Sequence, residues 1–170
     1  MINVNQPAPD FELADLSGSL HRLKAMRGRP VLINFWSAEC PWSEQADREI
    51  IAGWEAWGER ITWWTIAANA NEPLELLEQT AAARRLPLVM IDAKGEIADL
   101  YDAQTTPNVF LVDAQGILRY HGAVNDRTFR QRTPAHFYLR DAVQALLEGR
   151  LPDIAETPPY GCTIVRFASG

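Results

Sequence analysis

The stretch Val31–Trp36 constrains the fold more than any other part of the chain. It reads Val-Leu-Ile-Asn-Phe-Trp and follows Pro30, so aliphatic, β-branched and aromatic side chains run almost without interruption. A run that does not alternate between apolar and polar residues is typical of a strand buried on both faces. Such a strand needs a packed layer above and below it, and the sequence therefore predicts the centre of a sheet.

Strand and helix patterns alternate along the rest of the chain. The predicted elements, in chain order, are a hairpin of 11–13 with 20–23, a helix over 43–57, a strand over 61–68, a helix over 72–85 with Asn71 as its N-cap, a strand over 88–92, a helix over 96–101, a hairpin of 109–112 with 118–121, and a helix over 134–148 ended by Gly149. The first half requires parallel strands with right-handed crossovers, and the closing hairpin adds antiparallel ones. We expect an α/β fold, a three-layer sandwich with a mixed central sheet flanked by helices.

The length of 170 residues predicts one domain over 1–170, with a hairpin extension over 1–30 and a surface-packed tail over 150–170. A formal net charge of -6 argues against nucleic acid or an anionic membrane as a partner. No stretch is apolar enough to span a bilayer, and the first residues lack a signal-peptide pattern. We therefore expect a cytoplasmic protein without a membrane partner.

The chain has two cysteines, Cys40 and Cys162, and three histidines. Two cysteines are too few for a disulfide scaffold, and they lack the paired spacing of a zinc site. The histidines have no helical spacing that would pair them as ligands. We expect neither a metal nor another cofactor.

Cys40 lies where the strand Val31–Trp36 gives way to a helical pattern. The first N–H groups of a helix lack partners within it, and the helix dipole is positive at that end. Both effects favour the thiolate, which is the nucleophilic form of cysteine. Pro41 suits the first helical turn. We predict that Cys40 is at least partly exposed and that its thiol pKa lies below the free value of about 8.5.

Residues 34–43, Asn-Phe-Trp-Ser-Ala-Glu-Cys-Pro-Trp-Ser, resemble the active-site segment of thioredoxin. Residues 105–108, Thr-Thr-Pro-Asn, resemble the cis-proline loop of that fold. Segments 119–126 and 161–164 resemble a peroxiredoxin-like branch, the AhpC/TSA and thiol–disulfide isomerase group of thioredoxin-fold proteins. The resemblance covers nearly the whole chain. It implies a thioredoxin-like fold, a cis bond between Thr106 and Pro107, and an oxidoreductase or antioxidant role for Cys40.

The motif differs from both families at informative positions. Ser43 stands where thioredoxin has its second cysteine, so Cys40 cannot complete a dithiol cycle within the motif. The peroxiredoxin pattern Pro-x-x-x-Thr-x-x-Cys is not met either, since Ile33 and Ser37 occupy the Pro and Thr positions. The motif therefore supplies a single cysteine.

We expect a thiol-dependent oxidoreductase that carries out thiol–disulfide exchange or peroxide reduction. Cys40 would attack the substrate, Ser43 would hydrogen-bond its thiolate, and Cys162, a second protein or a small thiol would resolve the intermediate. The residues implied in substrate binding are Trp36 and Trp42, as an apolar rim, with Thr106 and Pro107. Expected partners are protein or small-molecule thiols and disulfides, with peroxide as a further substrate.

Two questions stay open in the sequence. The alternative function is a non-catalytic binding module that recognises peptides beside Pro107. For Cys162, the tail could approach Cys40, because loop closure costs little more for a long loop than for a short one. The alternation of 163–167 instead predicts an edge strand with Cys162 as a packed thiol. Since the cytoplasm keeps thiols reduced, we expect two separate, reduced cysteines.

Overall fold

The computed structural model describes residues 2–166. A five-stranded sheet with the order β5-β4-β3-β7-β8 lies at its centre. These strands are β3 (Val31–Trp36), β4 (Thr62–Ala67), β5 (Val89–Ile91), β7 (Asn108–Val112) and β8 (Leu118–Gly122). Strand β3 pairs in parallel with β4 and antiparallel with β7, so the predicted mixed α/β sheet is confirmed.

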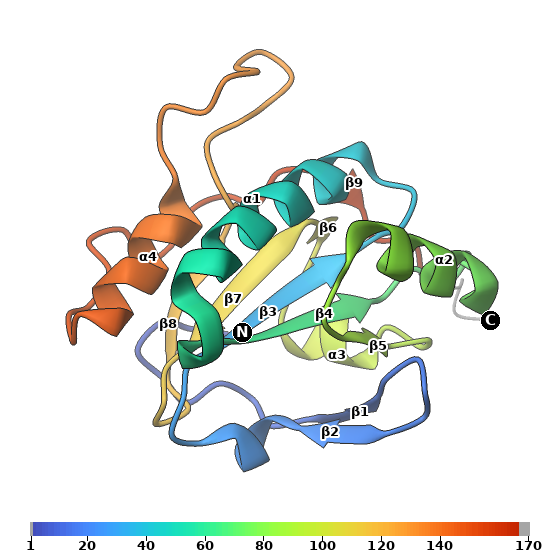
Figure 1. Ribbon diagram of the computed structural model, residues 1–170, viewed down its shortest axis with the longest axis horizontal. Helices are drawn as coiled ribbons and strands as arrows, with labels where there is room; N and C mark the ends of the chain where they lie inside the picture. Colours follow the sequence, from blue (N-terminus) through green and yellow to red (C-terminus); the bar gives the residue numbers. More distant parts are fainter. Residues whose placement is uncertain (1, 167–170) are drawn as a thin grey trace.

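Helices and an N-terminal hairpin cover the two faces of this sheet (Figure 1). The helices are α1 (Pro41–Trp57), α2 (Leu74–Arg84), α3 (Glu96–Leu100) and α4 (Tyr138–Leu147). Helices α1, α2 and α4 lie on one face, and α3 lies on the other with the hairpin of β1 (Glu12–Ala14) and β2 (Leu20–Arg22). No helix among residues 2–166 is both long enough and apolar enough to cross a membrane.

All six side chains of β3 are buried, as the apolar run predicts. Because side chains alternate across a strand, Leu32 packs in the core beneath α1 and α4. Ile33 and Phe35 join the opposite core, which includes Phe11 and Tyr101. The sheet thus has hydrophobic core on both faces, and the end of β3 leads directly to Cys40.

Two predicted helix starts are wrong. Helix α2 begins at Leu74 with Pro73, not Asn71, as its N-cap, because a proline disfavours helical geometry in the residue before it. Helix α4 begins at Tyr138 rather than Pro134. There the carboxylate of Asp126 accepts a hydrogen bond from the Ala135 N–H at 2.8 Å, which holds the preceding backbone outside the helix.

Of the predicted tail over 150–170, residues 167–170 lie outside the described residues, and the preceding part returns across the sheet edge. The Thr157 hydroxyl accepts a hydrogen bond from the Ala123 N–H at 3.0 Å and lies 2.7 Å from the Tyr120 hydroxyl. Gly122 permits this approach, since a Cβ there would lie 2.2 Å from the Thr157 carbonyl oxygen. The tail includes β9 (Cys162–Thr163), which pairs with β6 (Thr105–Thr106).

Replacing Thr65 by valine is expected to stabilise the protein by up to about 1 kcal/mol. Thr65 is fully buried in β4, and its Oγ1 has no hydrogen-bond partner among the described residues. Valine keeps the shape and removes the cost of burying an unpaired hydroxyl. Urea unfolding measures the change. The control Thr65→Ala should destabilise, because it also removes a packed methyl group; a destabilising Thr65→Val would mean that the hydroxyl has a partner.

Candidate active site

Cys40 is the N-cap of α1, and Pro41 is the first residue of the helix, as predicted. A short loop joins it to the end of β3. The expectation of an exposed thiol is wrong, since only 2% of Cys40 is exposed. The cause lies in the C-terminal tail, which reaches the sulfur atom and covers it.

Cys40 forms a disulfide with Cys162, although 122 residues separate them. Their Cα atoms lie 6.2 Å apart, within the range for such a bond. The expectation of two separate, reduced cysteines is therefore wrong. Cys162 does enter an edge strand, but its partner residue is Thr106, whose carbonyl oxygen lies 3.2 Å from Cys40 Sγ. The pairing of β9 with β6 thus positions Cys162 next to Cys40.

The peptide bond between Thr106 and Pro107 is cis, as the resemblance implied. Thr106 is fully buried, and its carbonyl oxygen faces the Cys40 sulfur. The Thr105 hydroxyl donates to the Pro107 carbonyl oxygen at 3.1 Å. The cis-proline loop therefore contacts both ends of the disulfide, by its carbonyl oxygen on one side and by strand pairing on the other.

Ser43 is buried one turn into α1. Its hydroxyl oxygen accepts a hydrogen bond from the Ser37 N–H at 3.3 Å, which ties the loop before Cys40 to the helix. Among the hydrogen bonds of residues 2–166, none joins Ser43 to the bonded sulfur of Cys40. A hydrogen bond from Ser43 to a Cys40 thiolate stays a prediction for the reduced state.

Trp36 does not form a rim at the site. It is 0% exposed, and its indole Nε1 donates to Asp47 Oδ2 at 2.8 Å. The alternation of β3 directs this side chain inward, against Leu77 of α2 and Ala67 of β4. Trp42, by contrast, is partly exposed. Its ring packs edge-to-face against the ring of Tyr160, with 4.9 Å between the ring centroids.

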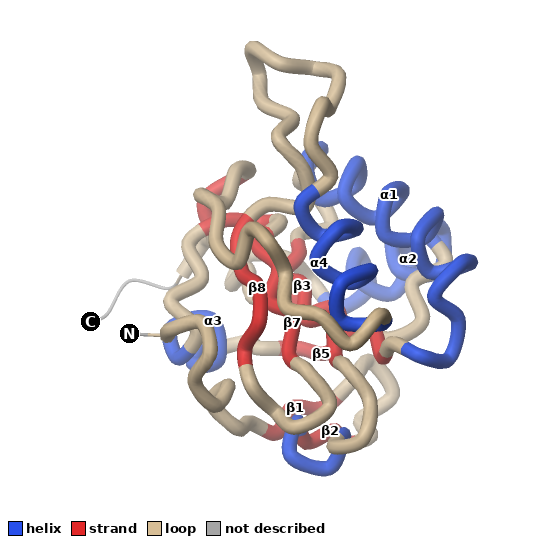
Figure 2. The backbone as a smooth tube through the Cα atoms, turned by 90° about the vertical axis from the view of Figure 1, so that its left-hand side faces the viewer, coloured by secondary structure: helices blue, strands red, loops and turns tan. Residues whose placement is uncertain are grey.

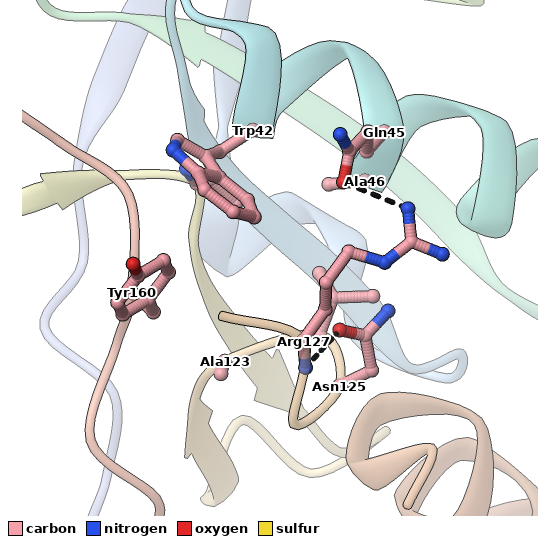
Figure 3. Close-up of a pocket in the computed structure, with 9 residues that line it drawn as sticks. Trp42, Gln45, Ala46, Ala123, Asn125, Arg127 and Tyr160 are labelled. Atoms are coloured by element: carbon pink, nitrogen blue, oxygen red, sulfur yellow. Dashed lines mark hydrogen bonds between the residues drawn. The ribbon is translucent and has the colours of Figure 1, made fainter. Parts of the chain in front are cut away.

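Sequence reasoning missed a small pocket beside Pro107 (Figure 3). Trp42, Tyr160 and Arg127 line it, and its free volume of about 20 Å³ suits little more than one water molecule. Arg127 Nη1 donates to Gln45 Oε1 at 2.7 Å, across the pocket from the tail. No pattern in the sequence joins these residues, because they come from α1, the loop after β8 and the tail.

A buried ion pair supports the loop before Cys40. Arg84 Nη1 lies 3.1 Å from Asp47 Oδ2, and Arg84 Nη2 donates to the Ala38 carbonyl oxygen at 2.9 Å. Burial raises the pKa of Asp47 to about 6, even though hydrogen bonds from Trp36 and Arg84 act to lower it. Burying the ionised Asp47 thus costs free energy. Its pairing with Arg84 holds the guanidinium that positions the Ala38 backbone, which leads into Cys40. Within 2–166, no group of acidic, histidine or cysteine side chains could hold a metal ion.

Comparisons with known proteins agree with this geometry. The thiol-disulfide oxidoreductase ResA of Geobacillus kaustophilus is 32% identical over 119 residues, which are 68% of this chain and 66%, just under two thirds, of that protein. The thiol:disulfide interchange protein DsbE of Yersinia pestis is 28% identical over 75% of this chain and 69% of its own length. An uncharacterized conserved protein from Geobacillus kaustophilus, 24% identical, has the same fold, with a TM-score of 0.90 over 100% of this chain and 95% of its own.

The resemblance noted in the sequence thus has independent support in both sequence and fold. The family model described as AhpC/TSA matches residues 4–121, which carry Cys40 and the cis-proline loop. The tail with Cys162 lies outside the matched region. The match covers well over half of the chain, and the protein belongs to the AhpC/TSA family.

Proposed function

We propose that this protein is a thiol–disulfide oxidoreductase that cycles between the Cys40–Cys162 disulfide and the corresponding dithiol. The disulfide at the N-terminus of α1, beside the cis-proline loop, carries the proposal. Cys162 supplies the second thiol that Ser43 does not, and it comes from the tail instead of the helix. The relatives named as thiol-disulfide oxidoreductases support this assignment.

The reduced pair would act in two exchange steps. The Cys40 thiolate attacks one sulfur of a substrate disulfide, and the other substrate sulfur leaves as a thiolate. The Cys162 thiolate then attacks Cys40 Sγ, which releases the second substrate thiol and forms the Cys40–Cys162 bond. Two electrons and two protons pass to the substrate. The disulfide form would oxidise a substrate dithiol by two exchange steps of the same kind, in which two electrons and two protons pass to the protein.

Accessibility points to Cys162 as the sulfur that an incoming thiol attacks in the oxidised protein. Cys40 is 2% exposed, whereas Cys162 is partly exposed. Attack at Cys162 also releases Cys40 as the leaving thiolate, at the positive end of α1. The helix terminus therefore stabilises the charge that develops on the departing sulfur.

Protein thiols and disulfides are the proposed substrates. The alternative reaction is peroxide reduction, in which a Cys40 sulfenate would condense with Cys162 to give the same disulfide. A purely binding role is disfavoured by a disulfide at the site, because a binding module needs no second cysteine beside the first. The cytoplasmic location predicted from the sequence stays a prediction.

The Cys162→Ser variant tests the proposal. Wild type should lose two hydrogens on oxidation and regain them with dithiothreitol, as followed by mass spectrometry. The variant should instead hold a mixed disulfide on Cys40 after reaction with a substrate disulfide, and multiple turnover should fall at least about tenfold, since resolution then depends on an external thiol.

Cys40→Ser is the matched control and should remove all turnover. Turnover of Cys162→Ser at the wild-type rate would contradict the proposed cycle. Faster oxidation by hydrogen peroxide than by a disulfide peptide at equal concentration would favour the peroxide alternative.

A further inference from the structure

Residues 125–137 form a loop, called the arm below, that stands out from the body of the molecule between β8 and α4 (Figures 1 and 2). The arm carries Arg127, Arg130 and Arg132. Its Phe129 is 71% exposed and lies under the Arg132 guanidinium, 5.9 Å from the ring centroid. The arm therefore presents cationic and aromatic groups that the α/β core does not use.

The arm has a defined structure that connects it to the redox site. At its base the Asp126 carboxylate accepts hydrogen bonds from Gln131, Ala135 and His136. Partial burial acts to raise the pKa of Asp126, but these hydrogen bonds outweigh it and hold the pKa below its usual range. The Asp126 carboxylate therefore stays charged. At its outer part the Phe129 N–H donates to the Tyr160 hydroxyl at 2.9 Å, two residues before Cys162 in the chain.

Within the described part of the chain, the positive charges of Arg130 and Arg132 are not matched by carboxylates, whereas Arg127 interacts electrostatically with Glu49. Among the ion pairs of residues 2–166, none includes Arg127, Arg130 or Arg132, and Arg127 Nε is buried without a hydrogen-bond partner. The Asp126 carboxylate is turned to the arm's own base, as described above. Arg130 and Arg132 therefore form a local positive patch on a chain of formal net charge -6, and this patch would attract anionic partners.

Open hollows lie beside the cis-proline loop and along the arm. The pocket beside Pro107 adjoins a hollow of about 380 Å³ that Phe129 and Arg132 line, because Trp42, Gln45 and Arg127 border both. Small molecules bind in enclosed pockets that cover most of their surface. A shallow, extended surface with a pocket of about 20 Å³ beside Pro107 fits a polypeptide segment better.

We propose that the arm docks an acidic, extended polypeptide segment whose cysteine or disulfide reacts at Cys40–Cys162. This inference rests on the proposed function and names its substrate class. Carboxylates of the segment would pair with Arg130 and Arg132 while its cysteine lies at the disulfide. Charge pairs of this exposed kind mainly raise the association rate and the selectivity, so the effect should weaken with salt.

The test compares cysteine peptides of equal length with acidic, neutral or basic flanks. The rate at which each reduces the oxidised protein is divided by the rate with uncharged dithiothreitol. For wild type at low salt, the acidic peptide should react about tenfold faster than the basic one, and 0.5 M salt should remove most of this difference. The Arg130→Gln/Arg132→Gln variant should lose most of the selectivity.

Arg29→Gln/Arg85→Gln is the matched control, with the same change of charge outside the arm, and it should keep the selectivity. Equal rates for acidic and basic peptides in wild type, with normal reduction by dithiothreitol, would overturn the docking proposal alone. The same arginine dependence for a small carboxylate-bearing thiol would assign the arm to a small molecule and overturn it as well. No reduction by dithiothreitol would overturn the proposed function.

Discussion

Replacing Gly161 by alanine is expected to shift the protein from the Cys40–Cys162 disulfide toward the dithiol. A Cβ at this position would lie 2.0 Å from the carbonyl oxygen of Thr106 and 2.7 Å from its carbonyl carbon. Both are backbone atoms of β6, next to the cis proline, and they cannot yield as a flexible side chain would. The tail must therefore move away, and β9 loses the pairing that holds Cys162 against Cys40.

We expect the equilibrium constant for forming the disulfide, measured against a glutathione buffer, to fall at least about tenfold. Thr163→Ala is the matched control, because it shortens an exposed side chain in β9 and should leave the equilibrium nearly unchanged. An alanine at 161 that leaves the equilibrium constant at the wild-type value would show that the β6–β9 pairing does not position Cys162.

The second large effect is a loss of stability with rising pH that originates at Asp47. Burial raises the pKa of its carboxyl from 3.8 to about 6, against the hydrogen bonds from Trp36 and Arg84. Between these two pH values the native state binds the proton and the unfolded state does not, so unfolding releases a proton. The stability contributed by Asp47 therefore falls as pH rises through this window, by about 3 kcal/mol in total.

The comparison with Asp47→Asn isolates this contribution, since the amide can still accept from Trp36 but does not titrate. The free energy of unfolding of wild type minus that of the variant should decrease by about 2.4 kcal/mol between pH 4 and pH 7. Denaturant titrations at a series of pH values measure it. A difference that increases over this range would mean that Arg84 dominates over burial and that the pKa of Asp47 is lowered.

Much of the scaffold of the site is predictable from short stretches of sequence. The apolar run of β3, the change to helical period at α1 and the position of Cys40 between them all depend on neighbouring residues, and the structure confirms them. The cis bond before Pro107 followed from a local motif, which the structure also confirms. Patterns of this kind can be recognised in the sequence because a few neighbouring residues are enough to show the periodicity of a strand or helix.

The oxidation state and the surroundings of Cys40 depend on contacts between distant segments. The sequence predicted these contacts wrongly or not at all. Cys162 meets Cys40 only because β9 pairs with β6, and Trp36 is buried because β3 places it beneath α2. The position of Arg127 beside Gln45 likewise joins a loop to a helix 82 residues away. By itself the sequence determined a thioredoxin-like α/β fold with a cysteine at a helix N-terminus. Only the tertiary structure decided which second sulfur bonds to this cysteine and which residues surround the site. The reason is that strand pairing and side-chain packing between remote segments produce no periodic pattern in the sequence.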